Sequence, residues 1–359
     1  PQTGARRRRV KQRQTAPGQT APDSAGNVTK QIIQGKRRGA MAVYTEVSFE
    51  DLQALLKNYD IGKPTSFKGI AEGVENSNFL LTTERGGFIL TLYEKRVHAE
   101  DLPFFLGLLE HLAAKGIACP VPVRRQDGAQ SMTVNGRPAA LLTFLDGLSL
   151  RRPEAAHCAQ VGAVLAHMHD AGRDFALKRP NALGPQGWPP LVEATRARAE
   201  TVQEGLANLI AEALAVTHAE WPENLPAGII HADLFPDNVL FMNGTISGMI
   251  DFYFACNDAF AYDLAVMLNA WCFENDGSYN LTKGRALLSG YSKARALSPA
   301  EMAALPVLAR GAALRFLLTR LYDWLNPDPG ALVRPKDPRE FAKRLRFHMG
   351  VKRAAEYGI

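Results

Sequence analysis

The amino-acid sequence predicts an α+β protein with two lobes: an N-terminal lobe of antiparallel β-strands carrying one helix, and a larger, mainly helical C-terminal lobe. The pattern changes after Asp146-Gly147, where short apolar runs separated by turn residues give way to Ala- and Leu-rich segments with helical periodicity. The chain has 359 residues, 46% of them hydrophobic, so it can bury the core of two lobes. We therefore predict a β-rich lobe at 41–143 and a helical lobe at 144–359.

Residues 1–40 differ from the rest of the chain and are predicted to form a disordered basic tail. They hold ten Lys or Arg against one Asp, so the net charge of +6 leaves 6 − 9 = −3 for the remainder. No aromatic residue in this tail could stack on a base, which argues against a nucleic-acid partner.

Cysteine usage and hydropathy indicate a cytoplasmic protein. The four cysteines are too few and too widely spaced for a disulfide framework, and no Cys-x-x-Cys pair suggests a zinc or redox site. An apolar run of about 18 residues, which would predict a membrane span, is missing. No apolar run of signal-peptide length follows the basic tail either. We expect no membrane partner.

The N-terminal lobe begins with paired strands, predicted from Phe67 to Lys95 with a turn at Gly86-Gly87. A helix is predicted from Ala99 to Lys115, because apolar residues recur there at intervals of three and four. Pro103 suits the first turn of this helix, and Gly116 suits its end. Further strands are predicted, the last two joined by a hairpin turn, at Pro122–Arg125, Ser131–Val134, Asn135-Gly136 (the turn) and Ala139–Phe144.

The C-terminal lobe is predicted to be helical from Ala155 to Gly172 and from Leu191 to His218. The helical period is interrupted once, between Gly228 and Phe254. Short apolar runs and a second Asn-Gly turn, Asn243-Gly244, stand there instead and predict an embedded β-hairpin.

This hairpin region carries the strongest functional motif, IIHADLFPDNVLFMNGTISGMIDF. A histidine precedes an aspartate by two positions and an asparagine follows that aspartate by five, which is the spacing of a kinase catalytic loop: His231, Asp233 and Asn238. The two strands and their turn then return the chain to Asp251 beside Asn238. The alternative is that these are ordinary loop and capping residues.

Phosphoryl transfer explains why these residue types are needed. The protein must orient the attacking oxygen and neutralise charge that develops on the phosphate. Asp233 is predicted to be the catalytic base, which accepts the hydroxyl proton of the substrate. Asn238 and Asp251 offer the oxygen ligands that Mg²⁺ prefers, whereas we assign His231 to bracing the loop.

The run HADLFPDN, the following IDF, the later AYDLA and the helix with LAHMH together resemble the aminoglycoside phosphotransferase and choline kinase superfamily, whose fold is protein-kinase-like. The segments GVENSNFLLTT, FILTLYEK, DLPFFLGLLEHLAAKGI and RFLLTRLYDW look most like the bacterial homoserine kinase of this fold. This resemblance implies an enzyme that uses ATP and Mg²⁺ to phosphorylate the hydroxyl of L-homoserine, in threonine biosynthesis. The alternatives are a choline, ethanolamine or aminoglycoside kinase, and a kinase-like binding protein that transfers no phosphate.

The resemblance also implies roles for individual residues. Asp233 aligns with the catalytic base, and Asn238 and Asp251 align with the metal ligands. Asp263, in AYDLA, matches a position that braces the catalytic loop. The chain from Leu142 through Phe144 to residue 146 matches the link between lobes, whose backbone would bind adenine.

Two departures from the superfamily concern the phosphates of the nucleotide. GVENSNF stands where a Gly-rich loop is expected, and a tight turn there could aim backbone amides at phosphate, with the residues Asn76, Ser77 and Asn78. Thr91 occupies the position of the usual third-strand lysine. Lys95, Arg96 or additional metal charge is the expected substitute.

An amino-acid substrate needs a cation for its carboxylate and a group for its amine. Arg320 and Asp323 lie three positions apart on a predicted helix and therefore share a face, and arginine suits bidentate binding of a carboxylate. Arg315 is a further candidate, and Trp271 could close the pocket. The alternatives are a surface ion pair for Arg320 and Asp323, and a core position for Trp271.

Overall fold

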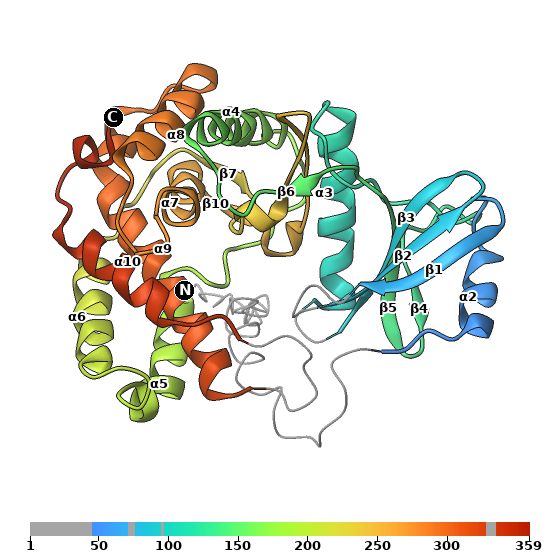
Figure 1. Ribbon diagram of the computed structural model, residues 1–359, viewed down its shortest axis with the longest axis horizontal. Coiled ribbons are helices and arrows are strands. Elements are labelled where there is room, and N and C mark those ends of the chain that lie inside the picture. The colour runs from blue at the N-terminus through green and yellow to red at the C-terminus, as the bar shows by residue number, and fades with distance from the viewer. Residues whose placement is uncertain (1–44, 71–75, 95–96, 328–334) are drawn as a thin grey trace, which may run out of the picture.

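The computed structural model describes residues 45–70, 76–94, 97–327 and 335–359. Two lobes lie side by side, one built around a β-sheet and the other from helices, as predicted (Figure 1). The basic tail at 1–40, together with Lys95 and Arg96, falls outside the described residues.

The N-terminal lobe contains a five-stranded sheet in which every neighbouring pair of strands is antiparallel. The strand order is β1-β2-β3-β5-β4, with bounds β1 (Pro64–Ile70), β2 (Asn76–Thr83), β3 (Gly86–Tyr93), β4 (Met132–Val134) and β5 (Arg137–Thr143). The predicted Asn135-Gly136 turn joins β4 to β5, with φ angles of 49° and 75°. These positive angles are the ones that a two-residue hairpin turn requires.

Two details of this lobe were predicted wrongly. Thr83 pairs with Gly86, so the hairpin loop between β2 and β3 is Glu84-Arg85, and Gly86 uses its φ of +129° at the start of β3. Residues 122–125 do not form a strand: among them Pro122 makes only an isolated bridge to Leu142. Proline has no N–H for a β-ladder, which explains the interruption.

A helix that the sequence analysis missed covers the outer face of the sheet. α2 (Phe49–Leu56) begins with a capping box in which Ser48 and Asp51 exchange side-chain to backbone hydrogen bonds. Leu52 and Leu55 of α2 pack against sheet residues in a small core of their own. Ser-x-x-Asp before an apolar run was the sequence signal that could have revealed it.

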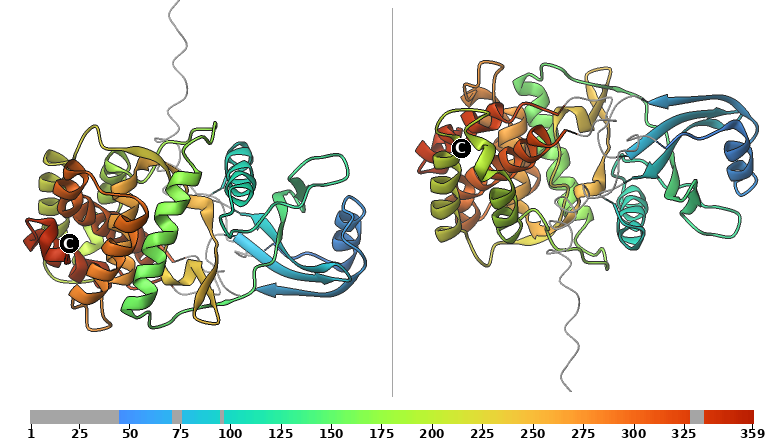
Figure 2. Two further views of the ribbon diagram at one scale, coloured as in Figure 1. Left: turned by 90° about the horizontal axis from the view of Figure 1, so that it is seen from above. Right: turned by 90° about the horizontal axis from the view of Figure 1, so that it is seen from below.

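The predicted long helix is confirmed as α3 (Leu102–Ala114), preceded by a 3₁₀ turn, η1 (Ala99–Asp101). Pro103 lies in its first turn, and Gly116 follows its end with a φ of +85°. The buried residues of α3 belong to the same core as the helical lobe. Both views in Figure 2 place α3 between the sheet and that lobe.

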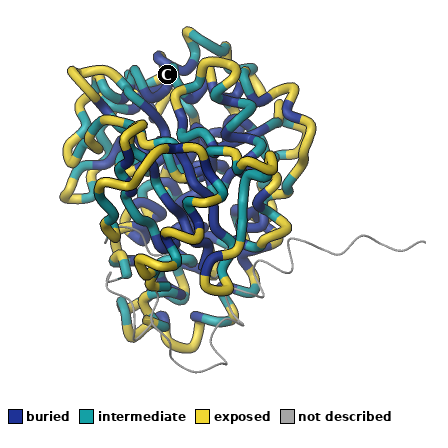
Figure 3. Tube along the Cα trace, turned by 90° about the vertical axis from the view of Figure 1, so that its right-hand side faces the viewer, coloured by how far each residue is buried: buried dark blue, intermediate teal, exposed yellow. Residues whose placement is uncertain are grey.

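The helical lobe is organised around α9, whose residues are largely buried. Its helices are α4 (Ala155–Ala171), α5 (Trp188–Ala199), α6 (Leu206–Ala219), α7 (Phe260–Trp271), α8 (Leu281–Ala294), α9 (Pro299–Leu325) and α10 (Arg339–Gly350). The segment predicted as helical from Leu191 to His218 is two helices, because Gly205 adopts a φ of +73° between α5 and α6. The buried stretches run through the interior of the molecule (Figure 3).

α9 is long and apolar enough to cross a membrane by length and composition alone. In its most apolar window, however, 78% of the residues are buried inside the protein. Its apolar surface is therefore used by the core of the helical lobe.

The embedded β structure is confirmed between α6 and α7. β8 (Val239–Met242) and β9 (Thr245–Met249) form the hairpin, and β6 (Leu148–Ser149) pairs with β8. β7 (Ala227–Ile230) pairs with β10 (Cys256–Ala259). Asn243-Gly244 makes the predicted turn with φ angles of 53° and 80°. The chain between β7 and β8 and the chain after β9 therefore end up together.

Candidate active site

The loop between β7 and β8 brings Asp233 and Asn238 into contact. The Nδ2 atom of Asn238 donates to the backbone oxygen of Asp233 at 2.8 Å and to its Oδ2 at 3.3 Å. Asn238 ends a short 3₁₀ turn, η3 (Pro236–Asn238), which brings the amide back over the loop. The local geometry of five residues thus orients the carboxylate of Asp233.

The hairpin β8–β9 places Asp251 beside this pair. The N–H of Ile250 donates to the backbone oxygen of Asn238 at 2.9 Å, so Asp251 follows a residue that is bonded directly to the loop. Asp251 has a φ of +65°, which is uncommon for a residue other than glycine, and precedes the turn η4 (Phe252–Phe254). Its side chain is exposed. The backbone of Asp251 is therefore placed next to the loop that carries Asp233 and Asn238.

His231 connects the two halves of the site. Its Nδ1 lies 3.3 Å from the backbone nitrogen of Asp233, and its Nε2 lies 3.0 Å from the backbone oxygen of Ile250. Burial lowers the pKa of His231, so the ring is neutral at pH 7. A neutral ring can accept a hydrogen bond from the N–H of Asp233 at Nδ1 and donate one to the backbone oxygen of Ile250 from Nε2. His231 therefore links the loop at Asp233 to the chain just before Asp251.

Asp263, from α7, braces the loop from behind. Its Oδ2 accepts the N–H of His231 at 2.7 Å, and its Oδ1 accepts the N–H of Ala232 at 2.8 Å. His169 lies 3.1 Å from Oδ2. Burial opposes ionisation of Asp263, but the hydrogen bond and charge of His169 and the loop amides outweigh it and lower its pKa. The position of Asp263 fits the bracing role that we expected for it.

Two residues predicted to contact the substrate lie behind the loop instead. Arg315 is 1% exposed and donates from Nη1 to the backbone oxygen of Ala232, whose φ is +63°. Trp271 is also 1% exposed, and its Nε1 donates to the backbone oxygen of Leu234 at 2.8 Å. Both side chains support carbonyls of the loop because the core leaves them no path to its surface.

The predicted phosphate turn also differs. Asn76, Ser77 and Asn78 lie in strand β2, paired with β3, so their backbone groups take part in a ladder and form no tight turn. The Oγ of Ser77 donates to Glu94 at 2.6 Å, and Asn78 accepts from the hydroxyl of Thr91 at 2.9 Å. Residues 71–75, which precede them, lie outside the described residues.

The link between lobes follows β5, as expected. Leu142 is buried at the end of this strand, whereas Phe144 is 42% exposed, and the N–H of Phe144 donates to the backbone oxygen of Gly87 at 3.2 Å. Thr91, at the position of the usual lysine, is 1% exposed. Its side chain is thus enclosed, with the hydroxyl bonded to Asn78.

A charged rim surrounds the outer end of the loop. Arg320 of α9 pairs with Glu340 of α10 at 2.5 Å, and its guanidinium lies 4.4 Å from the ring centre of Phe341. Lys336 pairs with Asp237 of the catalytic loop at 3.1 Å. Asp323 lies on the same helix as Arg320 and is partly buried. Lys336 and Glu340 were not predicted from the sequence, and no motif marks them.

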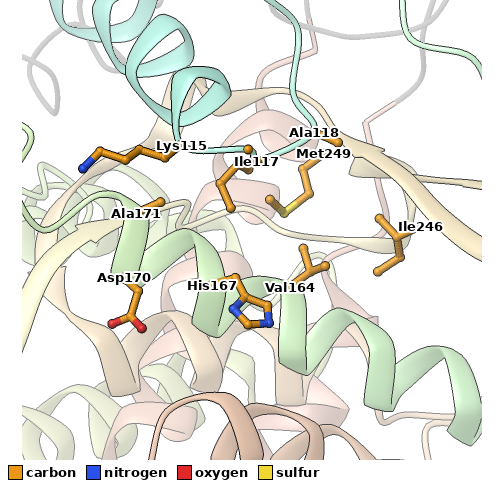
Figure 4. A pocket seen from close by; sticks show the side chains of 10 residues that line it. Lys115, Ile117, Ala118, Val164, His167, Asp170, Ala171, Ile246 and Met249 are labelled. Carbon is orange, nitrogen blue, oxygen red and sulfur yellow. The ribbon is translucent and has the colours of Figure 1, made fainter.

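A cavity of about 470 Å³ lies elsewhere at the lobe junction, between the C-terminal end of α3, α4 and β9. Figure 4 shows Ile117, Val164, Ile246 and Met249 around it, with charged groups nearby. None of the residues of the catalytic loop lines this cavity. It is therefore separate from the catalytic loop.

The donor set fits a hard divalent cation that arrives with a nucleotide. Within the described ranges there is no group of three His, Cys, Asp or Glu side chains placed to hold a metal alone. Asn238 uses its Nδ2 toward Asp233, which leaves the Oδ1 atom for a cation, and the carboxylate of Asp251 is exposed. Such a site needs phosphate oxygens and water to complete it.

The model of the phosphotransferase enzyme family matches residues 66–297. The chain belongs to this family. A homoserine kinase from Xanthobacter autotrophicus is 63% identical to this chain over 319 residues, which are 89% of this chain and 99% of that protein. A homoserine kinase from Chelativorans sp. is 61% identical over 319 residues, again 89% of this chain and 99% of that protein.

Solved structures show the same fold. An amicoumacin kinase, hAmiN, in complex with AMP-PNP, Ca²⁺ and Ami superposes with a TM-score of 0.62 at 17% identity, over 83% of this chain and 91% of that one. The predicted kinase-like fold of the phosphotransferase enzyme family is thereby confirmed.

Proposed function

We propose that this protein is an ATP-dependent homoserine kinase, which transfers the γ-phosphoryl group of ATP to the side-chain hydroxyl of L-homoserine and forms O-phospho-L-homoserine. The observation that carries the choice of acceptor is the 61–63% identity to homoserine kinases over nearly their whole length. The product would serve threonine biosynthesis. The contact between Asp233 and Asn238 supports phosphoryl transfer in particular.

Asp233 acts as the base in this proposal. Its carboxylate accepts the hydroxyl proton of homoserine while the homoserine oxygen attacks the γ-phosphorus of ATP, and the bond from the γ-phosphorus to the bridging oxygen breaks to release ADP. Asn238 keeps the carboxylate oriented through Nδ2. Asn238 and Asp251 are the residues that would hold Mg²⁺. When bound, this ion supplies positive charge that stabilises the phosphate oxygens during transfer. His231 and Asp263 keep the loop in place.

For the nucleotide, we propose that the backbone of residues 142–146 contacts adenine. The Thr91 hydroxyl, already bonded to Asn78, cannot supply the charge of a lysine. Lys95, outside the described residues, stays our candidate for that charge. Asn76 lies at the start of β2, and its buried Oδ1 has no hydrogen-bond partner among the described residues. Of the residues in this strand, we propose Asn76 as the one that binds a water molecule attached to the phosphates.

For the acceptor, we propose that the charged rim recognises the amino-acid end of homoserine. Arg320 can offer its planar fork to the carboxylate, and Asp323 on the same face can accept the ammonium group. Arg320 forms an ion pair with Glu340 at 2.5 Å, and in the complex it would bind Glu340 and the substrate carboxylate at the same time. Lys336 adds a second cation beside Asp237.

We place the enzyme in the cytoplasm. Its four cysteines are all free and buried, which suits a reducing compartment.

A transfer assay with radiolabelled ATP tests the acceptor directly. L-Homoserine, choline, ethanolamine and an aminoglycoside are compared under the same conditions. We expect homoserine to be phosphorylated with the highest kcat/KM, and preference for any of the others would reject the proposed acceptor. Asp233→Ala is expected to slow transfer by about a hundredfold or more while ATP still binds. Unchanged turnover would remove Asp233 from the mechanism.

The carboxylate site is tested by Arg320→Met. Loss of a bidentate ion pair is expected to raise the KM for homoserine by about tenfold or more with little change in the KM for ATP. Arg196→Met is the control for loss of a helix arginine, because Arg196 makes an exposed ion pair with Glu193 on α5. Equal KM values for the two variants would exclude Arg320 from substrate binding.

A further inference from the structure

Helix α3 is fastened to the chain that follows Asp251 by two side chains, Arg179 and Tyr253. We propose that these are positioning residues, which couple α3 to the segment 251–257 and so hold Asp251 where it can bind the metal. In protein kinases, an ion pair between a lysine of the third strand and a glutamate of the corresponding helix joins helix and active site. The inference rests on the proposed role of Asp251.

The usual ion pair has no partners in the described part of this chain. Thr91 stands at the lysine position and donates to Asn78 at 2.9 Å. Glu110, the carboxylate within α3, faces the other way and pairs with Arg124 at 2.7 Å. Some other contact must therefore relate α3 to the catalytic residues.

Arg179 supplies one such contact from the segment after α4. Its guanidinium lies 4.9 Å from the ring centre of Phe105, in α3. The Nε atom lies 3.6 Å from Asp101, in the turn that begins the helix. On the other side, Nη1 donates to the backbone oxygen of Ala255 at 3.3 Å. One guanidinium thus touches both α3 and the chain four residues beyond Asp251.

The main chain of Arg179 is itself anchored, so its side chain starts from a defined place. Its N–H donates to the Oδ1 of Asn257 at 2.8 Å, and its backbone oxygen accepts from the N–H of Asn257 at 2.6 Å. The side chain of Arg179 is only 14% exposed. Low exposure limits screening by solvent, which strengthens the cation's contacts with Phe105 and Asp101.

Tyr253 supplies the second contact, two residues after Asp251. Its ring meets Phe105 edge-on, with centres 5.8 Å apart, and meets Tyr93 of β3 edge-on at 5.2 Å. The two tyrosine hydroxyls lie 3.2 Å apart. At this distance one hydroxyl can donate a hydrogen bond to the other. Arg179 and Tyr253 therefore both pack against Phe105.

Only a few residues separate these contacts with α3 from Asp251. Phe252, between Asp251 and Tyr253, packs against His231 with ring centres 4.5 Å apart. Tyr253 is therefore two residues from Asp251, in a segment whose middle residue, Phe252, is packed against the catalytic loop. The far end of α3 is secured separately, by Lys115 and Asp174 at 2.7 Å. Arg179 and Tyr253 thus govern the half of the helix nearest the metal ligands.

The test compares Arg179→Met with Arg124→Met, which breaks the exposed ion pair on the opposite side of the same helix. Hydrogen exchange is measured on the ligand-free protein, for α3 and for residues 252–257. Arg179→Met is expected to speed exchange in both segments and to raise the Mg²⁺ concentration for half-maximal activity by about tenfold. Arg124→Met should speed exchange at most in α3 and leave the Mg²⁺ requirement unchanged.

Two further variants separate the contributions of the Arg179 charge, the planar shape of its guanidinium and the Tyr253 hydroxyl. Arg179→Lys keeps the cation but loses the planar fork, so it should fall between wild type and Arg179→Met. Tyr253→Phe keeps the ring and loses the hydroxyl contact, and is expected to raise the Mg²⁺ requirement by about threefold, as for one neutral hydrogen bond.

The coupling is overturned if exchange in residues 252–257 and the Mg²⁺ requirement are unchanged in Arg179→Met, or if Arg124→Met changes both equally. A wild-type protein that fails to phosphorylate homoserine would reject the proposed function instead. In that case the exchange measurements still decide whether α3 and residues 252–257 move together.

Discussion

Asp263→Asn is the substitution that best tests how the catalytic loop is held. Asp263 is fully buried and accepts three hydrogen bonds, from the backbone N–H groups of His231 and Ala232 and from the ring of His169. The two backbone donors approach different carboxylate oxygens. Asparagine has the same shape but only one acceptor oxygen. In either orientation of the amide, therefore, one loop N–H must face an NH₂ group.

The cost follows from these contacts. One buried N–H left without an acceptor costs about 1–3 kcal/mol, and loss of the negative charge weakens the remaining bonds by about 1 kcal/mol. We expect destabilisation by about 3 kcal/mol, or a fall in Tm of about 6–10 °C. Because Asp233 is two residues from His231, the transfer rate should fall by about 10- to 100-fold through misplacement of the base.

Thermal unfolding and steady-state kinetics measure both effects. Asp170→Asn is the matched control, since Asp170 lies on the exposed face of α4 and pairs only with exposed Arg173 among the described residues. The control should stay within about 0.5 kcal/mol of wild type, as surface substitutions usually do. If Asp263→Asn behaved like this control in both assays, the carboxylate of Asp263 would not be what holds the loop.

Three other predictions concern stability and the tail. Gly290→Ala would place a Cβ 2.1 Å from the backbone oxygen of Ala159, where α8 crosses α4, so denaturant unfolding should show a loss of about 2–3 kcal/mol; a loss near zero would contradict this rigid contact. Burial lowers the pKa of His348 from 6.5 to about 3, so the unfolded chain takes up a proton below about pH 6.5 while the folded protein does not. Above pH 6.5, His348 should cost no stability, whereas at pH 5 it alone should lower the free energy of unfolding by about 2 kcal/mol. Unfolding curves measured over a pH series test this, and the prediction is refuted if the His348→Gln variant loses stability with falling pH as steeply as wild type. Deletion of residues 1–40 should leave kcat/KM for homoserine within about twofold, since a solvated tail makes few contacts, and a large loss in the transfer assay would give the tail a role.

The sequence alone determined the features that depend on short stretches of chain. Asp233 and Asn238 are five residues apart in one loop, and the structure brings them into contact at 2.8 Å. The two Asn-Gly turns are confirmed because their positive φ angles are a local property of those residues. Residues so close in sequence can meet whatever packs around them.

Tertiary packing decided which side chains face the site. Arg315 shares a helix with Arg320, and no spacing rule separates a core position from a rim position on a helix as apolar as α9. Only the contact with Ala232, 83 positions away, shows that Arg315 supports the loop. The contacts of Arg179 likewise join segments 74–78 residues apart. Such encounters depend on how whole helices pack, and a local pattern of residues contains no information about that.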